Sequence, residues 1–231
     1  MRLSWWKITS VVLLAYTFAA GLLLDVPRLP QLQETIRNLY FHVCMWFVMM
    51  ILFIVSAMHA IKFLRAGNFK HDIYSRQFAV VGMVFGLLGY ATGMIWMSYT
   101  WADPNNTTFV SFSAVAREPK LIGTAIALLI YAAYLVLRDS IQDVDKRARI
   151  SAVYNLFAFA FLFPTIWVLP RMLPSLHPGQ DGNPALNKND VDVSMRIVFY
   201  PAIAGWTLLG VWIASLKVRL NKQTENKLVQ Q

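Results

Sequence analysis

The sequence predicts an all-α integral membrane protein with six transmembrane helices and both termini in the cytoplasm. Hydrophobic residues make up 57% of the 231 residues and charged residues only 14%, whereas soluble domains carry about a quarter charged residues. The mean hydropathy is +0.48. Apolar runs long enough to span a bilayer, roughly 17 to 25 residues each, recur along the chain. The predicted spans are Ile8–Leu24, Tyr40–Phe63, Phe78–Tyr99, Leu121–Leu137, Ile150–Leu169 and Ile197–Leu216.

The first span follows a short basic start at Arg2 and Lys7, as the apolar core of a signal peptide does. Its core is long for a signal peptide, and no small-x-small cleavage site precedes the exit at Asp25–Pro27. We therefore expect this span to be retained as a helix. The second span contains the lone cysteine, Cys44. A single cysteine implies no disulfide framework, and we expect Cys44 to be a small core residue.

The distribution of basic residues predicts the orientation of the chain. Counted over alternate connections, one set holds 14 of the 21 lysines and arginines and the other set holds 7. By the positive-inside rule the richer set is cytoplasmic, and this places both termini inside, in agreement with an even number of spans. The orientation accounts for the net charge of +9. Because no basic stripe lies on a soluble domain, we expect the lipid bilayer and no nucleic acid as a partner.

Three loops then face outward, whereas the cytoplasmic loops are short and charged. The outer loops are Asp25–Leu39, Thr100–Lys120 and Pro170–Arg196. The first ends in an amphipathic stretch, Leu32–Tyr40, and Pro164 offers a kink within the fifth span. We expect residues 1–216 to form a single six-helix transmembrane domain, followed by a polar and disordered cytoplasmic tail at residues 217–231.

Two of the four histidines, His42 and His177, fall at the outer edge of the membrane. His42 opens the second span among aromatic residues, where an unpaired buried polar ring costs roughly a few kcal/mol. The alternatives are an interfacial histidine that reaches water and a solvated loop side chain. Neutral imidazole is a common metal ligand and an axial ligand of haem iron. Two imidazoles on one membrane face therefore favour a haem site there, with both residues as iron ligands.

The other two histidines are expected elsewhere. His59 follows His42 by seventeen positions on the same predicted helix, which corresponds to about 25 Å along the helix axis. It should therefore lie near the inner face, and we expect no histidine partner for it inside the membrane. His71 falls in a predicted cytoplasmic loop and is expected to be solvated.

The second outer loop adds aromatic and charged residues. Trp96 and Trp101 flank its beginning, and Asp103 follows. Aromatic planes can pack against a porphyrin face, and interfacial cations can pair with its propionates. The candidate cations are Arg117, Lys120 and Arg171. The alternative is an ordinary interfacial belt, because Trp and Tyr gather at any membrane surface.

Five stretches of the chain together point to a family. They are Arg37–Val43, Gly89–Trp101, Pro119–Gly123, Ser175–Gly179 and Met195–Pro201, the last running into Trp206. In these stretches the chain resembles the haem-handling membrane proteins of bacterial cytochrome c maturation, the CcmC/CcsA family, and in particular the six-helix CcmC type. The resemblance covers nearly the whole chain, including the number and orientation of the helices.

The resemblance implies a function and its partners. Members of this family hold haem on the outer face through two loop-associated histidines and a tryptophan-rich WWD segment. They present it to a periplasmic haem chaperone, and they work with an ATP-binding-cassette transporter in the bacterial inner membrane. Carried over, this implies that His42 and His177 are the axial ligands of haem b, iron protoporphyrin IX. Trp96, Trp101 and the loop after them are then the haem platform. The expected activity is haem docking and transfer rather than catalytic turnover.

The tryptophan-rich loop departs from the family pattern, so we describe it as a degenerate WWD loop. The family loop reads approximately Trp-Gly-x-Trp-Trp-x-x-Asp, whereas the tandem tryptophans are missing after Trp101. Phe109 and Phe112 are the aromatic residues that follow. Either these two rings partly replace the tryptophans or the haem site is weakened. Cys44 also stands where many relatives have proline.

Two functions from other classes stay open on the sequence. A membrane b-type cytochrome in electron transfer needs histidines paired inside the bilayer, and a redox cycle coupled to quinone oxidation would favour it. A small-solute permease subunit tends to have broken helices or charges near mid-membrane. These spans have almost none beyond the region of His59. Substrate uptake without haem absorbance would favour the permease.

Overall fold

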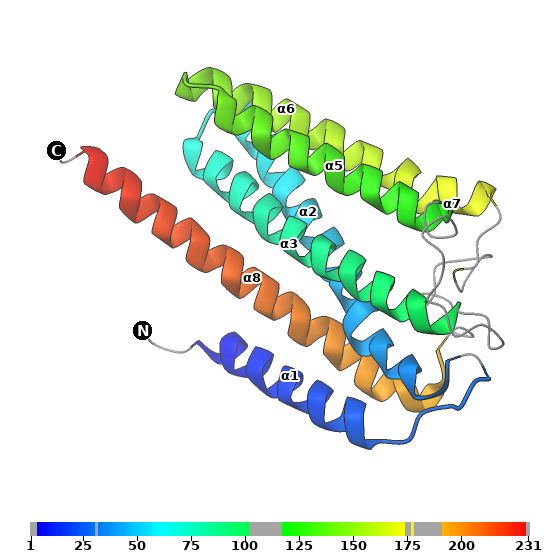
Figure 1. Cartoon of the computed structure of the whole chain (residues 1–231). Coiled ribbons are helices and arrows are strands. Elements are labelled where there is room, and N and C mark those ends of the chain that lie inside the picture. Colours follow the sequence, from blue (N-terminus) through cyan, green and yellow to red (C-terminus); the bar gives the residue numbers. More distant parts are fainter. Residues whose placement is uncertain (1–3, 31, 102–116, 174–176, 178–190, 230–231) are drawn as a thin grey trace.

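The computed structural model describes residues 4–30, 32–101, 117–173, 177 and 191–229, and every regular element in these ranges is helical. The long helices in Figure 1 are α1 (Trp5–Leu23), α2 (Leu39–Ala66), α3 (Phe69–Thr100), α5 (Pro119–Ser140), α6 (Val144–Phe163) and α8 (Val193–Val229). The short elements are the 3-10 helix η1 (Gln33–Asn38), the π-helical turn η2 (Pro164–Val168) and α7 (Leu169–Met172).

Within the described residues, six helices are long and apolar enough to cross a membrane. They coincide with the six predicted spans, the fifth being α6 together with η2. The prediction of an all-α, multi-pass integral membrane protein is therefore confirmed. The amphipathic stretch before the second span is helical as well, and it forms η1.

The helices extend beyond the apolar runs that predicted them. α3 begins at Phe69 and not at Phe78, because the side chain of Asn68 accepts a hydrogen bond from the backbone N–H of Lys70 (2.9 Å) and caps the helix. The polar residues after this cap form the first turns of α3. The expectation that His71 lies in a loop was therefore wrong, since hydropathy detects only the apolar part of a helix.

Residues 217–229 are helical where the sequence predicted a disordered tail, so that prediction was wrong for them. α8 has 37 residues and continues to Val229, and at roughly 1.5 Å per residue it is longer than a bilayer core of about 30 Å is thick. A helix already nucleated in the membrane propagates easily through Lys, Gln and Glu, which are good helix formers. At the other end of α8, hydrogen bonds from the hydroxyl and backbone N–H of Ser194 hold the pKa of Asp192 below its usual value.

The bundle has two different ends, which Figure 1 shows clearly. Both termini lie at one end, here called the terminal face, and η1 and α7 lie at the opposite end, here called the loop face. An even number of membrane crossings requires the two termini to share a face. The assignment of the terminal face to the cytoplasm remains the prediction made from the basic residues.

α2 and α3 pack closely because glycines line the contact. Glycines recur at intervals of three or four residues on α3, and a Cβ atom added to any of them would lie 3.0 Å or less from an α2 side chain. The pairs are Gly82 with Phe53, Gly86 with Met49, Gly89 with Trp46 and Gly93 with His42. Small residues at such positions let two helix backbones approach each other. Cys44 also lies in the core of α2, fully buried as expected.

The regular part of α6 ends just before Pro164, the residue at which the sequence predicted a kink. The chain continues as the π-helical turn η2, a geometry that often occurs near functional sites. Gly123 of α5 lies directly against the backbone carbonyl of Thr165 in this turn, so a Cβ at position 123 would collide with it. Gly123 therefore allows α5 to approach η2, which carries the chain into α7.

α1 is held against α8 by two hydrogen bonds to the α8 backbone. Pro201 lies inside α8 and has no N–H to donate to the carbonyl of Ile197. The hydroxyl of Tyr16 on α1 donates to that carbonyl instead, at 3.2 Å. The hydroxyl of Ser10 donates to the carbonyl of Gly205 at the same distance. The proline in α8 thus creates a docking point for α1.

Polar side chains are also buried between helices near the terminal face. Arg138 of α5 donates two hydrogen bonds to Asp72 of α3, at 2.7 and 2.5 Å, and both side chains are almost fully buried. Asn155 of α6 donates to the hydroxyls of Ser56 and Ser75, each at 2.8 Å. These contacts join α2, α3, α5 and α6 into one unit.

Candidate functional site

His42 lies in the first turn of α2, at the loop face, and only 6% of its surface is exposed. Its Nδ1 lies 2.9 Å from the carbonyl oxygen of Gly89 and 3.2 Å from the hydroxyl of Thr92, both on α3. Its Nε2 lies 3.3 Å from the indole nitrogen of Trp46, one turn further along α2. The alternative of an interfacial histidine that reaches water does not describe this residue, because both ring nitrogens have protein partners.

These partners fix one tautomer of the His42 imidazole. A carbonyl oxygen only accepts hydrogen bonds, so Nδ1 must carry the proton that it donates to Gly89. An indole nitrogen only donates, so Nε2 must present a lone pair to Trp46. The ring is therefore neutral, with one nitrogen anchored to the backbone and the other basic. Metal-binding histidines are typically oriented in this way.

Two tryptophans surround this imidazole. The rings of Trp46 and Trp96 meet it edge to face, with centroids 5.9 and 5.8 Å away. Trp96 also donates from its indole nitrogen to the hydroxyl of Thr35 in η1, at 3.1 Å. This bond ties the last part of α3 to η1, so the predicted platform residue Trp96 has a fixed position beside His42.

A groove of about 380 Å³ opens next to Trp96 at the loop face. It lies between η1, the start of α2 and the end of α3. Its apolar lining comes from Phe41, Ile95, Trp96 and Tyr99, and its polar lining includes residues of η1. A groove with one aromatic and one polar wall suits a flat ligand that carries charged groups at one edge.

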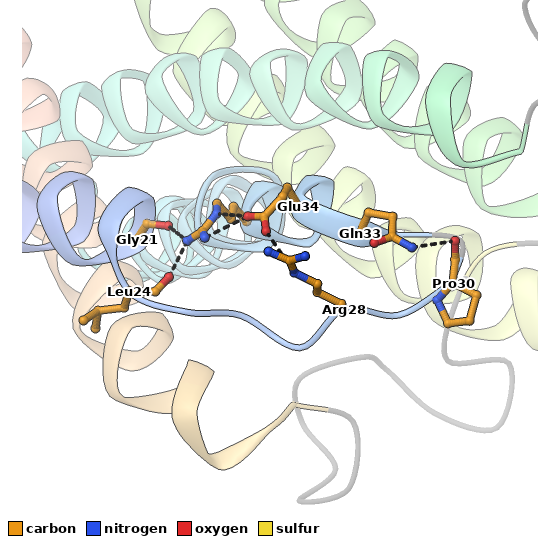
Figure 2. Close-up of polar contacts among 7 residues, drawn as sticks. Gly21, Leu24, Arg28, Pro30, Gln33 and Glu34 are labelled. Atoms are coloured by element: carbon orange, nitrogen blue, oxygen red, sulfur yellow. Dashed lines mark hydrogen bonds and ion pairs between the residues drawn. The ribbon is translucent and has the colours of Figure 1, made fainter.

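The polar wall of this groove is ordered by a charged cluster that joins η1 to the end of α1 (Figure 2). Arg37 donates hydrogen bonds to the carbonyl oxygens of Gly21 (2.8 Å) and Leu24 (2.6 Å) at the C-terminal end of α1. A cation at this end of a helix stabilises the exposed carbonyl groups. Its guanidinium also pairs with Glu34 at 2.8 Å. The second cation on Glu34 is Arg28, at 3.7 Å.

A second group of predicted site residues gathers on the α5 and α7 side of the loop face. The Nζ atom of Lys120, at the start of α5, lies 3.1 Å from Nδ1 of His177. Arg171 of α7 donates to the carbonyl of Trp167 (2.6 Å), and its guanidinium lies 5.4 Å from the centre of that indole ring. Arg117 lies just before α5 and is exposed. Of the three predicted cations, Lys120 therefore lies next to His177.

Both groups lie at the loop face, because His42 opens α2 and Lys120 opens α5 (Figure 1). Trp101 ends α3, where its backbone N–H donates to the carbonyl of Met97 at 3.0 Å. Asp103, Phe109 and Phe112 fall outside the described residues. The structure thus brings His42 together with Trp96, and His177 together with Lys120.

Sequence reasoning expected aromatic residues around His42 but missed its two side-chain hydrogen-bond partners, which are Trp46 and Thr92. The position of Trp46 could have been found, because residues four apart lie on one face of a helix. Thr92 could not, since its contact depends on how α3 is rotated against α2. Arg37 was noted only as part of a family-like stretch, and its role at the end of α1 follows from the fold.

The remaining two histidines are paired with each other, which corrects two expectations. Nδ1 of His59 on α2 lies 2.9 Å from Nδ1 of His71 on α3. The ring of Tyr74 stacks on His59, with centroids 4.8 Å apart. His59 therefore has a histidine partner, and His71 has a protein contact. The error arose because α3 begins earlier than its apolar run.

In the part of the chain that the structure describes, no three or more His, Cys, Asp or Glu side chains form a cluster that could hold a metal ion. Iron held by two imidazoles would take its other four ligands from a porphyrin. The loop face is consistent with that division of ligands, because the single imidazole of His42 lies beside Trp96, which lines the aromatic groove.

A family model described as heme exporter protein C, CcmC, matches residues 1–230. No curated protein matches the chain.

Proposed function

The chain belongs to the heme exporter protein C family, CcmC, and from this premise we propose that it holds haem at the outer membrane face and delivers it to a periplasmic haem chaperone. Membership of the family makes it a multi-pass membrane component of haem handling in cytochrome c maturation. The proposal adds the site, the ligands and the direction of delivery. It places the protein in the bacterial inner membrane, next to the ATP-binding-cassette transporter of the same pathway.

The observation that carries the proposal is the state of His42. Its Nδ1–H is anchored to Gly89, and Nε2, which carries the lone pair, is the atom able to bind iron. A carbonyl partner on the second nitrogen raises the basicity of an imidazole and fixes its direction, as it does for metal-bound histidines. His177 is the second proposed axial ligand. Its Nδ1 lies 3.1 Å from the Nζ atom of Lys120.

The surroundings fit a haem b cargo. The aromatic side of the groove, with Trp96 and Tyr99, can lie against a porphyrin. Lys120, Arg171 and Arg117 supply positive charge for the propionates on the side of His177, where charge-assisted hydrogen bonds are strong. Trp101, Asp103, Phe109 and Phe112 complete the proposed platform in the degenerate WWD loop.

Transfer rather than turnover follows from what such a site must do. It has to bind haem tightly enough to collect it and loosely enough to release it, and every factor of ten in affinity corresponds to about 1.4 kcal/mol. If a ligand of the chaperone replaces one of the two histidines, the iron is never without a partner. Exchange is then stepwise and no free haem is formed.

The rival functions are less well supported. A b-type cytochrome would use the His59–His71 pair, but these nitrogens are at hydrogen-bond distance, 2.9 Å, so no iron atom fits between them in this arrangement. A permease would have charges near mid-membrane. The buried ion pair of Asp72 and Arg138 instead lies in the first turn of α3 and the last turn of α5.

An absorption experiment tests the proposal. We expect the detergent-purified protein to show a bis-histidine haem spectrum, oxidised and reduced, that is lost or shifted in His42→Ala and in His177→Ala. His59→Ala and His71→Ala are matched controls, since they remove histidines at the terminal face, and their spectra should be unchanged. An unchanged spectrum and unchanged chaperone loading in the first two variants would reject both proposed ligands.

A further inference from the structure

The nitrogen of His42 that the proposed function assigns to iron is already occupied within the protein. The indole N–H of Trp46 donates to Nε2 at 3.3 Å. The lone pair on Nε2 lies in the plane of the imidazole and accepts one partner at a time. Iron and the Trp46 N–H therefore cannot share this nitrogen.

Both partners in this hydrogen bond are held by α3. The six-membered part of the Trp46 indole lies over Gly89, close enough that an added Cβ would sit 3.0 Å from it. The imidazole of His42 lies over Gly93 in the same way, at 2.6 Å. Because His42 and Trp46 are one turn apart on α2, the two glycines fix their rings side by side. The hydrogen bond is thus part of how the helices pack.

We propose that Trp46 is a positioning residue that occupies Nε2 of His42 when no haem is bound and competes with iron for it. This inference rests on the proposed function, because it concerns the nitrogen assigned there to iron. The N–H of Trp46 stabilises the haem-free state, so it lowers the affinity of the site for haem. When a chaperone takes the haem, the indole restores a partner to the buried imidazole, and no unsatisfied nitrogen is left behind.

The expected size of the effect follows from the strength of one buried neutral hydrogen bond. Such a bond contributes enough to change an equilibrium about three- to tenfold. We therefore expect Trp46→Phe, which keeps an aromatic ring and removes the donor, to bind haem about three- to tenfold more tightly than the unaltered protein. The absorption maxima should be unchanged, since the iron ligands are the same.

The test is a haem titration of the purified full chain in detergent, followed by absorbance, with a double-mutant cycle. The variants are Trp46→Phe, His42→Ala and the two together, and Trp212→Phe, which lies in α8 beside Trp6 of α1, is the matched tryptophan control. The gain in affinity from Trp46→Phe should vanish when His42 is absent. Trp46→Gln, which restores an N–H donor, should return the affinity toward that of the unaltered protein. Trp46→Met, a second variant without a donor, should repeat the gain.

The outcomes separate this inference from the proposed function. If His42→Ala leaves haem affinity and spectrum unchanged, His42 is not a ligand and the proposed function itself fails. If His42→Ala weakens binding while neither Trp46→Phe nor Trp46→Met strengthens it, the inference alone is overturned. A gain of equal size with and without His42 would also overturn it, because the effect of Trp46 would then be on packing and not on Nε2.

Discussion

At the scale of single residues, the position of His42 depends on the missing side chain at Gly93. The imidazole fills the space where a Cβ would stand, 2.6 Å from its Cε1 atom, and packed interiors do not adjust easily to an added methyl group. The same helix places Thr92 and Gly89 against Nδ1 of the imidazole. Three neighbouring positions on α3 therefore determine both the place and the tautomer of the proposed ligand.

We expect Gly93→Ala to weaken haem binding by roughly tenfold or more, which is about 1.4 kcal/mol, because it pushes His42 out of its hydrogen bonds. A haem titration of the purified variant measures the change. Ala91→Val is the control, since Ala91 is exposed on the same helix and the larger side chain meets no imidazole. Haem affinity in Gly93→Ala equal to that of the unaltered protein would contradict this account of His42.

At the scale of elements, buried polar contacts decide which helices stay together. The ion pair of Asp72 and Arg138 joins α3 to α5, and the hydroxyl of Tyr16 joins α1 to α8. In a membrane the apolar side chains of neighbouring helices gain little from meeting each other rather than lipid. Polar contacts and close glycine packing therefore carry much of the specificity of the bundle.

Asp72→Asn should destabilise the protein by about 3–5 kcal/mol, because it leaves the buried charge of Arg138 without a counter-ion. Thermal unfolding in detergent measures this loss. Arg76→Gln is the control, since it breaks the ion pair of Arg76 with Asp139, which is 3.0 Å long and partly exposed. Exposed ion pairs contribute only about 0–1 kcal/mol to stability. Replacing both Asp72 and Arg138 by apolar residues should restore most of the stability.

Tyr16→Phe should cost about 0.5–1.5 kcal/mol, the contribution of one hydrogen bond, because the carbonyl of Ile197 then has neither an N–H nor a hydroxyl donor. In a Pro201→Ala background the backbone of residue 201 supplies the missing N–H, so the same change should cost almost nothing. Unfolding of the four variants gives the coupling. Equal losses of stability in both backgrounds would show that Tyr16 does not replace the hydrogen bond that Pro201 cannot donate to the carbonyl of Ile197.

At the scale of the whole molecule, the fold separates two ends with different chemistry. The loop face carries His42, Trp96, Lys120 and the groove, whereas the terminal face carries the His59–His71 pair and the buried ion pair. The bundle thus keeps the proposed haem site away from both termini (Figure 1). Orientation in the membrane decides which compartment the site faces.

Cysteine labelling tests that orientation. We expect a membrane-impermeant maleimide to label Arg28→Cys at the loop face from the periplasmic side of intact spheroplasts. Arg65→Cys, at the end of α2 near the terminal face, should react only after permeabilisation. Both arginines are exposed, and the unaltered protein is the background control because Cys44 is fully buried. The reverse pattern would overturn the orientation predicted by the positive-inside rule.

Much of the fold follows from the sequence because the membrane imposes a simple rule. A chain in lipid must satisfy its backbone hydrogen bonds within helices, so long apolar runs such as Tyr40–Phe63 predict where helices occur. The ends were less well predicted, since Lys70, His71 and the polar end of α8 are helical without being apolar. The resemblance to the CcmC family rested on short stretches in a fixed order, and the family match confirms it.

The sequence alone determined the class of the protein, the six membrane-spanning helices found in the described residues and the candidacy of His42 and His177, because hydropathy, charge and residue type are local properties of a chain. Only the tertiary structure decided which atoms meet. The hydrogen bonds of His42 to Gly89 and Trp46, and the pairing of His59 with His71, depend on how far α3 is rotated and shifted against α2. That rotation results from the packing of glycines against large side chains along the entire contact, and no single segment of sequence contains it.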